Sequence, residues 1–269
     1  MRRVVHVTSG KGGVGKSMTS VAMIDHMRNV LKRPLAVYDA DGLVGGVARI
    51  FCTRDEAGAP LEKQDPLTGV GFYNIRSSER SMLVDCLALG TDLILHDLAG
   101  GSLADVCRVM GDDVNMATSV DKLLASYDRR GYRLTLVHVL SPDQAATGSI
   151  SQHLKLFGSR ADHVVVRNLF WGQDFPFWSG FLDSRGAQRG GNTRRQFQEL
   201  GGLEADLPPL QTVTAAKISS ENLPPSRGQD ATILSISEQD HCYNYLREVA
   251  GTKDSRGLGP LFDLLGASG

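Results

Sequence analysis

Short apolar runs bounded by turn residues recur along the first two thirds of the chain. They are rich in Val, Ile and Leu and lack polar alternation, which is typical of strands buried on both faces of a sheet. Most are separated by segments long enough for a helix, as the crossover between parallel strands requires. The pattern predicts an α/β fold, a doubly wound and mostly parallel sheet. The expected strands are 4–7, 35–39, 71–75, 93–97, 134–140 and 163–168.

The pattern is weaker after residue 168. Residues 237–249 predict a late helix, and the glycine-rich stretch 190–202 predicts a loop. We interpret residues 1–250 as a single domain and residues 251–269 as a C-terminal tail. The tail holds several leucines, but a proline and an aspartate interrupt them. Docking onto the protein's own surface is therefore favoured over insertion into a membrane.

Charge and cysteine content narrow the classes of function. Lys plus Arg number 29 and Asp plus Glu number 30, so no net charge would hold the protein on DNA or on an anionic membrane, and any such contact must be local. The four cysteines lie far apart, which is typical of reduced thiols rather than of a metal site. No segment approaches the roughly 20 apolar residues of a spanning helix. We expect a cytoplasmic protein.

The glycine-rich segment SGKGGVGKS, residues 9–17, follows the first expected strand and precedes a helical pattern from Lys16 to about residue 31. In such a loop the backbone N–H groups surround phosphate, and the helix N-terminus adds its positive dipole end. Lys16 would neutralise the outer phosphates, and the Ser17 hydroxyl would ligate Mg²⁺. An incidental glycine turn is the alternative. The expected phosphate-binding residues are Gly10, Gly12, Gly13, Val14, Gly15, Lys16, Ser17 and Met18.

The loop contains a second lysine, Lys11, in the pattern K-G-G-x-G-K-S. This pattern resembles the deviant Walker A motif of the ParA/MinD ATPases. The resemblance implies a P-loop NTPase fold, with ATP and Mg²⁺ as cofactors and residues 1–250 as the ATPase domain. It also implies that Lys11 reaches the phosphates of a partner subunit when an ATP-dependent homodimer forms, while Lys16 serves its own nucleotide. Alternatively, Lys11 is solvated or binds its own nucleotide.

Two aspartate motifs follow in the order of that family. DADG places Asp39 and Asp41 at the end of the second strand, and DLILHDLAGGS places Asp97 at the end of a later one. The resemblance implies that Asp39 and Asp97 hold Mg²⁺ and that Asp41 orients the attacking water. It makes 39–46 and 97–103 the switch segments. A turn that caps a helix is the alternative for DADG.

Two further residues are expected at the nucleotide base. HVVVRNLF ends a strand with Asn168, where relatives place an asparagine on the adenine edge, and LPPL contains Pro208 in the position of the loop that covers the base. A strand-ending asparagine is also a common turn former. The intervening segment 168–181 holds six of the 17 aromatic residues, including both tryptophans. Core packing and docking of a partner protein both remain open for it.

The biological role is less specified. The cysteine spacing does not resemble that of the iron–sulfur branches of the family. The motifs as a set loosely resemble ParA-like proteins of plasmid partition, stability and conjugative transfer, which implies a switch ATPase that hydrolyses ATP slowly and acts through a protein partner. A MinD-like membrane-positioning ATPase and a non-hydrolysing scaffold are the alternatives. Non-specific DNA contact would use four arginines, although such a run can also be simply solvated. They are Arg185, Arg189, Arg194 and Arg195.

Overall fold

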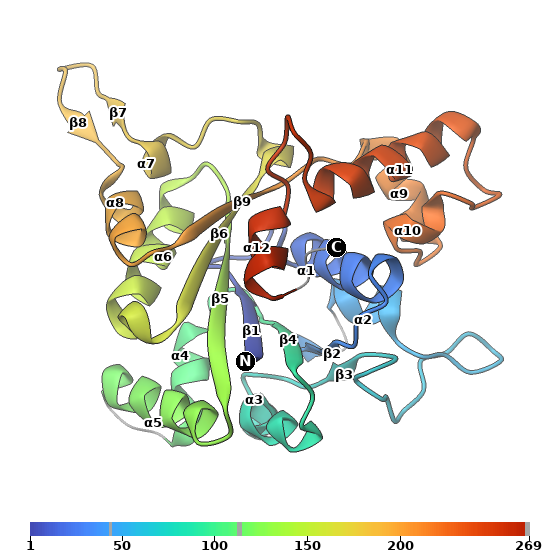
Figure 1. Ribbon diagram of the computed structural model, residues 1–269, viewed down its shortest axis with the longest axis horizontal. Coiled ribbons are helices and arrows are strands. Elements are labelled where there is room, and N and C mark those ends of the chain that lie inside the picture. Colours follow the sequence, from blue (N-terminus) through green and yellow to red (C-terminus); the bar gives the residue numbers. More distant parts are fainter. Residues whose placement is uncertain (43–44, 112–114, 267–269) are drawn as a thin grey trace.

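The computed structural model describes residues 1–42, 45–111 and 115–266, and at its centre these residues form a seven-stranded sheet (Figure 1). The strand order is β3-β2-β4-β1-β5-β6-β9, and every neighbouring pair is parallel. This confirms the predicted doubly wound parallel sheet. The strands are β1 Arg2–Thr8, β2 Ala36–Asp39, β3 Gly71–Phe72, β4 Leu93–Asp97, β5 Tyr132–Leu140, β6 Asp162–Asn168 and β9 Leu203–Leu207.

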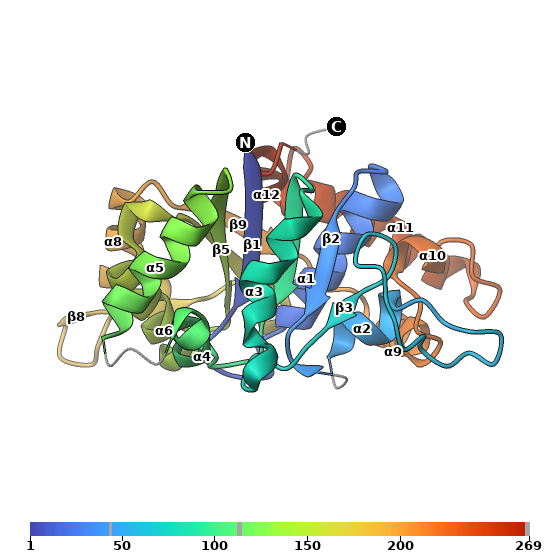
Figure 2. The same cartoon turned by 90° about the horizontal axis from the view of Figure 1, so that it is seen from below.

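Helices cover both faces of the sheet. In Figure 2, α3 and α5 lie in front of the strands, and α11 and α12 lie behind them. A small antiparallel hairpin, β7 Phe181–Leu182 with β8 Gln188–Arg189, projects from the body at the upper left of Figure 1. The helices are α1 Lys16–Ile24, α2 Gly46–Phe51, α3 Met82–Asp85, α4 Leu103–Cys107, α5 Met116–Asp128, α6 Gln144–Phe157, α7 Pro176–Ser179, α8 Asn192–Glu199, α9 Thr212–Ser220, α10 Pro225–Gly228, α11 Ile236–Ala250 and α12 Gly259–Leu264.

Burial on both faces explains the unalternating apolar strands. In β1, Val5 and Val7 belong to the core shared with α1, α11 and α12, whereas Val4 belongs to the core shared with α3 and α5. Successive side chains of a strand point to opposite faces, so a strand with two covered faces needs apolar residues at consecutive positions.

Two local expectations need correction. The stretch 190–202 contains the helix α8, because its glycines lie outside the helix: Gly191 is the N-cap with a φ of 75°, and Gly201 follows the C-terminal end. Phe197 anchors α8 and is fully buried. The helix expected from Lys16 to about residue 31 is present, but it continues beyond Ile24 as a π-helix over Asp25–Val30.

The C-terminal tail docks on the body of the protein, as expected. Leu258, Leu261 and Phe262 are buried in the same core as α1, and the Phe262 ring stacks on His26 at 4.4 Å between centroids. The Leu258 N–H donates to the Val249 carbonyl at 2.8 Å. Residues 267–269 of the predicted tail lie outside the described residues. No helix in the described part of the chain has the length and apolar content needed to cross a membrane.

Candidate functional site

The glycine-rich loop connects the central strand β1 to α1 at the carboxyl end of the sheet. β1 lies between β4 and β5, so this edge is the point where the strand order reverses, and open α/β sheets bind ligands there. Gly13 and Gly15 have φ values of 78° and 99°, a left-handed conformation that favours glycine. Lys16, the first residue of α1, is 9% exposed. The structure therefore places the loop, as predicted, in the strand–loop–helix context of a phosphate-binding loop.

Residues 97–103, which were expected to form the second switch segment, lie directly against this loop. The Gly101 N–H donates to the Ser9 carbonyl at 3.0 Å. A Cβ atom on Gly100 would lie 2.9 Å from the backbone nitrogen of Gly12, too close for any other residue without a backbone shift. Because the backbones of residues 100–101 and of the glycine-rich loop are in direct contact, a movement of one would displace the other.

Two buried carboxylates lie side by side next to the loop. Asp39 of β2 and Asp97 of β4 are directly paired in register at the carboxyl ends of adjacent strands. The Ser17 and Ser20 hydroxyls each donate to Asp97 at 2.9 Å. Asp39 accepts from the backbone N–H of Ala48 at 3.1 Å. Both of these hydroxyl donors to Asp97 lie in the first turn and a half of α1.

The pKa values of both aspartates are raised. Burial is the largest cause for Asp39, and the neighbouring charge of Asp97 adds to it, so that its pKa rises to about 7. Burial also raises the pKa of Asp97, although Lys16 and the two serine hydroxyls oppose the rise. Two buried carboxylates facing each other are an unfavourable arrangement unless a cation lies between them.

The oxygen atoms of Ser17, Asp39 and Asp97 are suitable ligands for Mg²⁺. The Ser17 hydroxyl and the two carboxylates are hard oxygen ligands at one edge of the sheet, and a divalent cation would relieve the repulsion that raises their pKa values. The described residues hold no cluster of three or more His, Cys, Asp or Glu side chains that could bind a metal by themselves. Mg²⁺ in phosphate sites uses one or two carboxylates and completes its shell with water and phosphate oxygens, so a small donor set is what it needs.

Asp41 lies at the surface and is paired with an arginine that the sequence did not point to. The Arg76 guanidinium lies 3.2 Å from the Asp41 carboxylate, and both side chains are about half exposed. Arg76 also donates to the Gly100 carbonyl at 3.0 Å. It therefore bridges the two segments that were expected to act as switches. Residues 43 and 44, inside the first of these segments, lie outside the described residues.

Lys11 is bound within its own chain. Its Nζ atom lies 3.0 Å from the Asp143 carboxylate, with 48% and 35% of the two side chains exposed. Asp143 also caps α6 by accepting from the Ala146 N–H, and it accepts from the Ser141 hydroxyl. Although burial opposes it, these hydrogen bonds and the Lys11 charge lower the pKa of Asp143 to about 2. The sequence S-P-D-Q after the strand signals a helix cap, but nothing in it predicts the contact with Lys11.

Asn168 holds the phosphate loop from the end of β6. It is 5% exposed, and its amide nitrogen donates to the Val14 carbonyl at 2.9 Å. Its amide oxygen accepts from the Phe170 N–H at 3.2 Å. A Cβ atom on Gly15 would lie 2.2 Å from the same amide nitrogen. Asn168 therefore lies beside the glycine-rich loop and has a structural role that the sequence did not reveal.

A cavity of about 280 Å³ opens beside the phosphate loop. Both residues expected at the base lie on its wall, together with Gly13 and Gly15 of the loop. Met18, Phe170 and Trp171 also line this cavity. The structure thus brings Asn168 and Pro208 to one hollow next to the loop, while their contact with a base stays a prediction.

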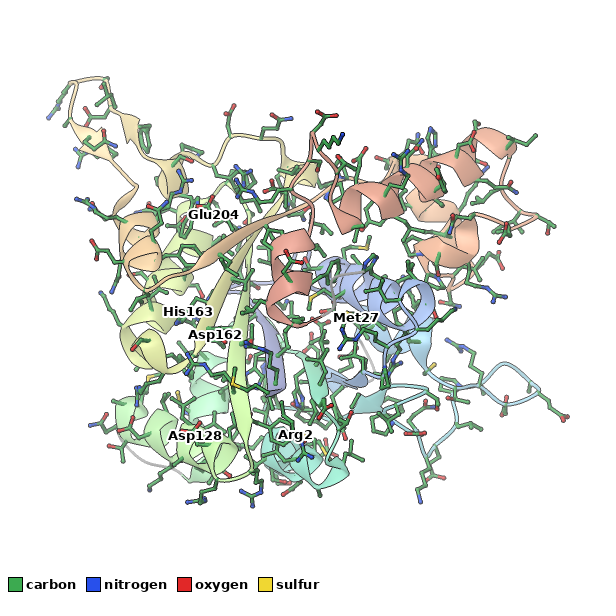
Figure 3. The ribbon with its side chains drawn as sticks, viewed as in Figure 1. Arg2, Met27, Asp128, Asp162, His163 and Glu204 are labelled. Carbon is green, nitrogen blue, oxygen red and sulfur yellow. The ribbon has the colours of Figure 1, made fainter. Side chains whose placement is uncertain are left out.

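The aromatic segment divides into two parts. Trp178 is 1% exposed, its indole N–H donates to Glu204 at 3.0 Å, and its ring packs against Phe197, which confirms core packing for this part (Glu204 is labelled on β9 in Figure 3). In contrast, Phe170 and Trp171 are 58% and 48% exposed.

Three of the four arginines expected at DNA have polar partners in their own chain. Arg189 pairs with Asp183 at 2.9 Å and Arg194 with Glu204 at 2.6 Å, and Arg195 donates to the Asn192 side chain at 2.5 Å. The two ion pairs reduce the free positive charge of this surface. DNA contact stays a prediction.

A phosphate-type loop at the reversal point of a doubly wound parallel sheet, with paired carboxylates beside it, defines the class of the P-loop α/β proteins. No protein-family model matches the sequence, and no curated protein aligns with it. In structure the chain is similar to a nucleotide-binding protein from Archaeoglobus fulgidus in complex with ADP, with 16% identity over 82% of this chain and 86% of that chain and a TM-score of 0.43.

Two further solved structures are similar. One is a ParA-family ATPase from Chlorobium tepidum, with 15% identity over 90% of this chain and 98% of that chain and a TM-score of 0.47. The other is pNOB8 ParA bound to nonspecific DNA, with 15% identity over 62% of this chain and 69% of that chain and a TM-score of 0.37.

Proposed function

We propose that this chain is a ParA/MinD-type switch ATPase that binds Mg·ATP, dimerises around it and hydrolyses it to ADP and phosphate. The observation that supports this best is the convergence of Lys16, Ser17 and the paired aspartates at the carboxyl end of β1. A positive charge, a hydroxyl and two carboxylates at a glycine loop are the set that binds a metal–triphosphate complex.

Each residue has a role in this proposal. The loop N–H groups and Lys16 bind the phosphates, and Ser17, Asp39 and Asp97 hold Mg²⁺. Bound Mg²⁺ neutralises the charge that develops on the phosphate oxygens. Asp41 orients the attacking water; Arg76 engages its Oδ1 atom, so release from Arg76 would free the whole carboxylate for this role.

The position of Lys11 fits a lysine that acts on a partner subunit. A half-exposed ion pair contributes only about 0–1 kcal/mol, so the contact with Asp143 orders Lys11 without fixing it. The phosphates of a second nucleotide carry more charge than one carboxylate and would compete for Lys11 as the dimer forms. Assembly and nucleotide state are then coupled, as they are when an arginine finger is supplied by a partner.

Light scattering with ADP and with a non-hydrolysable ATP analogue tests the dimer. We expect the mass of the wild type and of the control Lys155→Ala, which changes an exposed lysine of α6, to double with the analogue alone. Lys11→Ala should remain a monomer in both. A mass that does not depend on nucleotide, or a Lys11→Ala dimer, contradicts the proposal.

A second candidate, a nucleotide-dependent scaffold without hydrolysis, is favoured by one observation: Asp41 is engaged by Arg76. Phosphate release by wild type and by Asp41→Ala separates the two functions. Hydrolysis that Asp41→Ala abolishes supports the ATPase, whereas undetectable release by a wild type that binds ATP supports the scaffold.

We further propose a role in DNA or plasmid partition, stability or transfer, together with a protein partner. It rests on the resemblance of the motifs. Arg185 lies between the two strands of the projecting hairpin, has no ion-pair partner among the described residues and is therefore free to contact phosphate. Fluorescence anisotropy with duplex DNA should show analogue-dependent, salt-sensitive binding that Arg185→Ala weakens. The absence of binding at low salt would remove DNA from the proposal.

A further inference from the structure

The cavity beside the phosphate loop has an aromatic wall that the proposed chemistry does not use. Phe170 and Trp171 form part of a short 3-10 turn, Leu169–Trp171, that follows directly on β6. Both rings line the cavity and are about half exposed, although large aromatic side chains are usually buried. Two neighbouring exposed rings at the mouth of one cavity indicate a surface that is completed by something planar and apolar.

The size and position of the cavity select its occupant. At about 280 Å³ it lies just below the roughly 300–1,000 Å³ of pockets that enclose a whole drug-sized ligand, so it suits one planar group and not an entire nucleotide. Its wall is shared with Gly13 and Gly15, so the occupant must be continuous with whatever the loop binds. A nucleobase attached to loop-bound phosphates meets both conditions.

The two rings are arranged as a corner. Their centroids are 5.4 Å apart and their planes lie at 87° to each other. A base that stacks on the face of one ring therefore turns its own edge towards the face of the other, and both stacked and edge-to-face contacts between aromatic groups are favourable. The corner thus fixes the plane of the base and not just its presence.

One side chain sets the distance between this corner and the phosphate loop. The amide of Asn168 donates to the Val14 carbonyl in the loop and accepts from the Phe170 N–H in the turn. The phosphate-binding and aromatic surfaces are therefore held in register by a single buried group. This is the arrangement expected if one ligand spans both.

We propose that Phe170 and Trp171 form the stacking wall for the base of the bound nucleotide and thereby give the site its preference for nucleotides over base-free polyphosphates. This inference rests on the proposed function, because it requires that the loop bind phosphate. It assigns part of the aromatic segment to nucleotide selection, leaving Trp178 to the core.

Calorimetry with two ligands, ATP and inorganic tripolyphosphate, tests the wall. Stacking of a base on an aromatic side chain is worth enough that alanine substitution weakens binding by about 5- to 150-fold. We expect Trp171→Ala to bind ATP about tenfold more weakly, within that range, and to bind tripolyphosphate as the wild type does. The control Leu182→Ala removes an exposed apolar side chain of the nearby hairpin that is not part of the cavity wall, and should change neither affinity.

Fluorescence gives an independent readout, because the chain has two tryptophans and Trp178 is buried. ATP, but not tripolyphosphate, should quench the emission of the wild type. Trp171→Phe should keep the affinity for ATP and lose the quench.

The outcomes separate the two proposals. A wild type that binds neither ligand overturns the proposed function and this inference with it. A wild type that binds both ligands equally well, or a Trp171→Ala variant that loses affinity for both or for neither, overturns the inference alone.

Discussion

Acidification should destabilise this protein through its buried histidines. Among the residues that the structure describes, six of the seven histidines are buried. Burial, with a smaller contribution from the charge of His153, lowers the pKa of His6 to about 3. Burial likewise lowers the pKa of His153 to about 4, although its hydrogen bond to the Ser149 carbonyl opposes this. His153 lies in α6 beside His138 and near His163, which is labelled in Figure 3.

The sign and size of the effect follow from these pKa values. In the unfolded chain a histidine takes up a proton below about pH 6.5, whereas the folded protein keeps His153 neutral down to about pH 4. The stabilising contribution is therefore complete above pH 6.5 and is lost as the pH falls towards 4. At pH 5 the loss is about 2 kcal/mol for each such histidine. With His6 and His153 alone the total is about 4 kcal/mol, a large share of the roughly 5–15 kcal/mol that stabilises a typical domain.

Urea unfolding at pH 7 and pH 5, followed by circular dichroism, measures this contribution. His153→Leu should reduce the difference in unfolding free energy between the two pH values by about 2 kcal/mol, whatever it does to packing, because the packing cost is the same at both. Leu154→Ala, a change at the next buried position of α6, should leave that difference unaltered. A His153→Leu variant that loses as much stability on acidification as the wild type would refute the reasoning.

Three further predictions concern the site. Asn168→Ala leaves the Val14 carbonyl without its donor and should lower the free energy of unfolding in urea by about 1–3 kcal/mol; a variant as stable as the wild type would show that the amide does not hold the loop. Asp143→Asn keeps a good cap for α6 but removes the charge that holds Lys11. Because each dimer releases two such ion pairs, light scattering of a dilution series should show analogue-dependent dimers at protein concentrations up to about thirtyfold lower; an unchanged or weaker dimer speaks against the release of Lys11. Arg76→Ala frees Asp41 and should raise the basal rate of phosphate release, and a slower rate would instead assign the guanidinium to the reaction itself.

The glycine-rich loop between a strand and a helix, the main strands, and the positions of Asp39 and Asp97 at strand ends could be predicted from the sequence because their signals are local. A glycine-rich loop between a strand and a helix, or an aspartate at the end of an apolar run, can be interpreted without knowing the fold of the rest of the chain. The helix α8 was missed for the opposite reason: its local composition is dominated by glycines that lie just outside it.

The partners of the site residues could not be predicted, because they depend on contacts between distant parts of the chain. Arg76 reaches Asp41 and Gly100 from the loop after β3, and Asp143 reaches Lys11 from the start of α6. The sequence around Arg76 or Asp143 does not distinguish a side chain that forms such a contact from one that is only solvated. Parallel strands bring their carboxyl ends to one edge of the sheet. Which of the loops at that edge contact one another depends on the order of the strands, and the sequence does not give that order.

The bridge made by Arg76 has a consequence for how the two switch segments move. One guanidinium cannot stay bound to Asp41 and to the Gly100 carbonyl if only one of the two segments shifts. If one segment shifts, Arg76 keeps a single exposed contact and is less well ordered by it, so the loss of either contact weakens the other by at most about 1 kcal/mol. Displacement of one segment should therefore weakly favour displacement of the other, and Arg76→Ala should make probes on the two segments report independent movements.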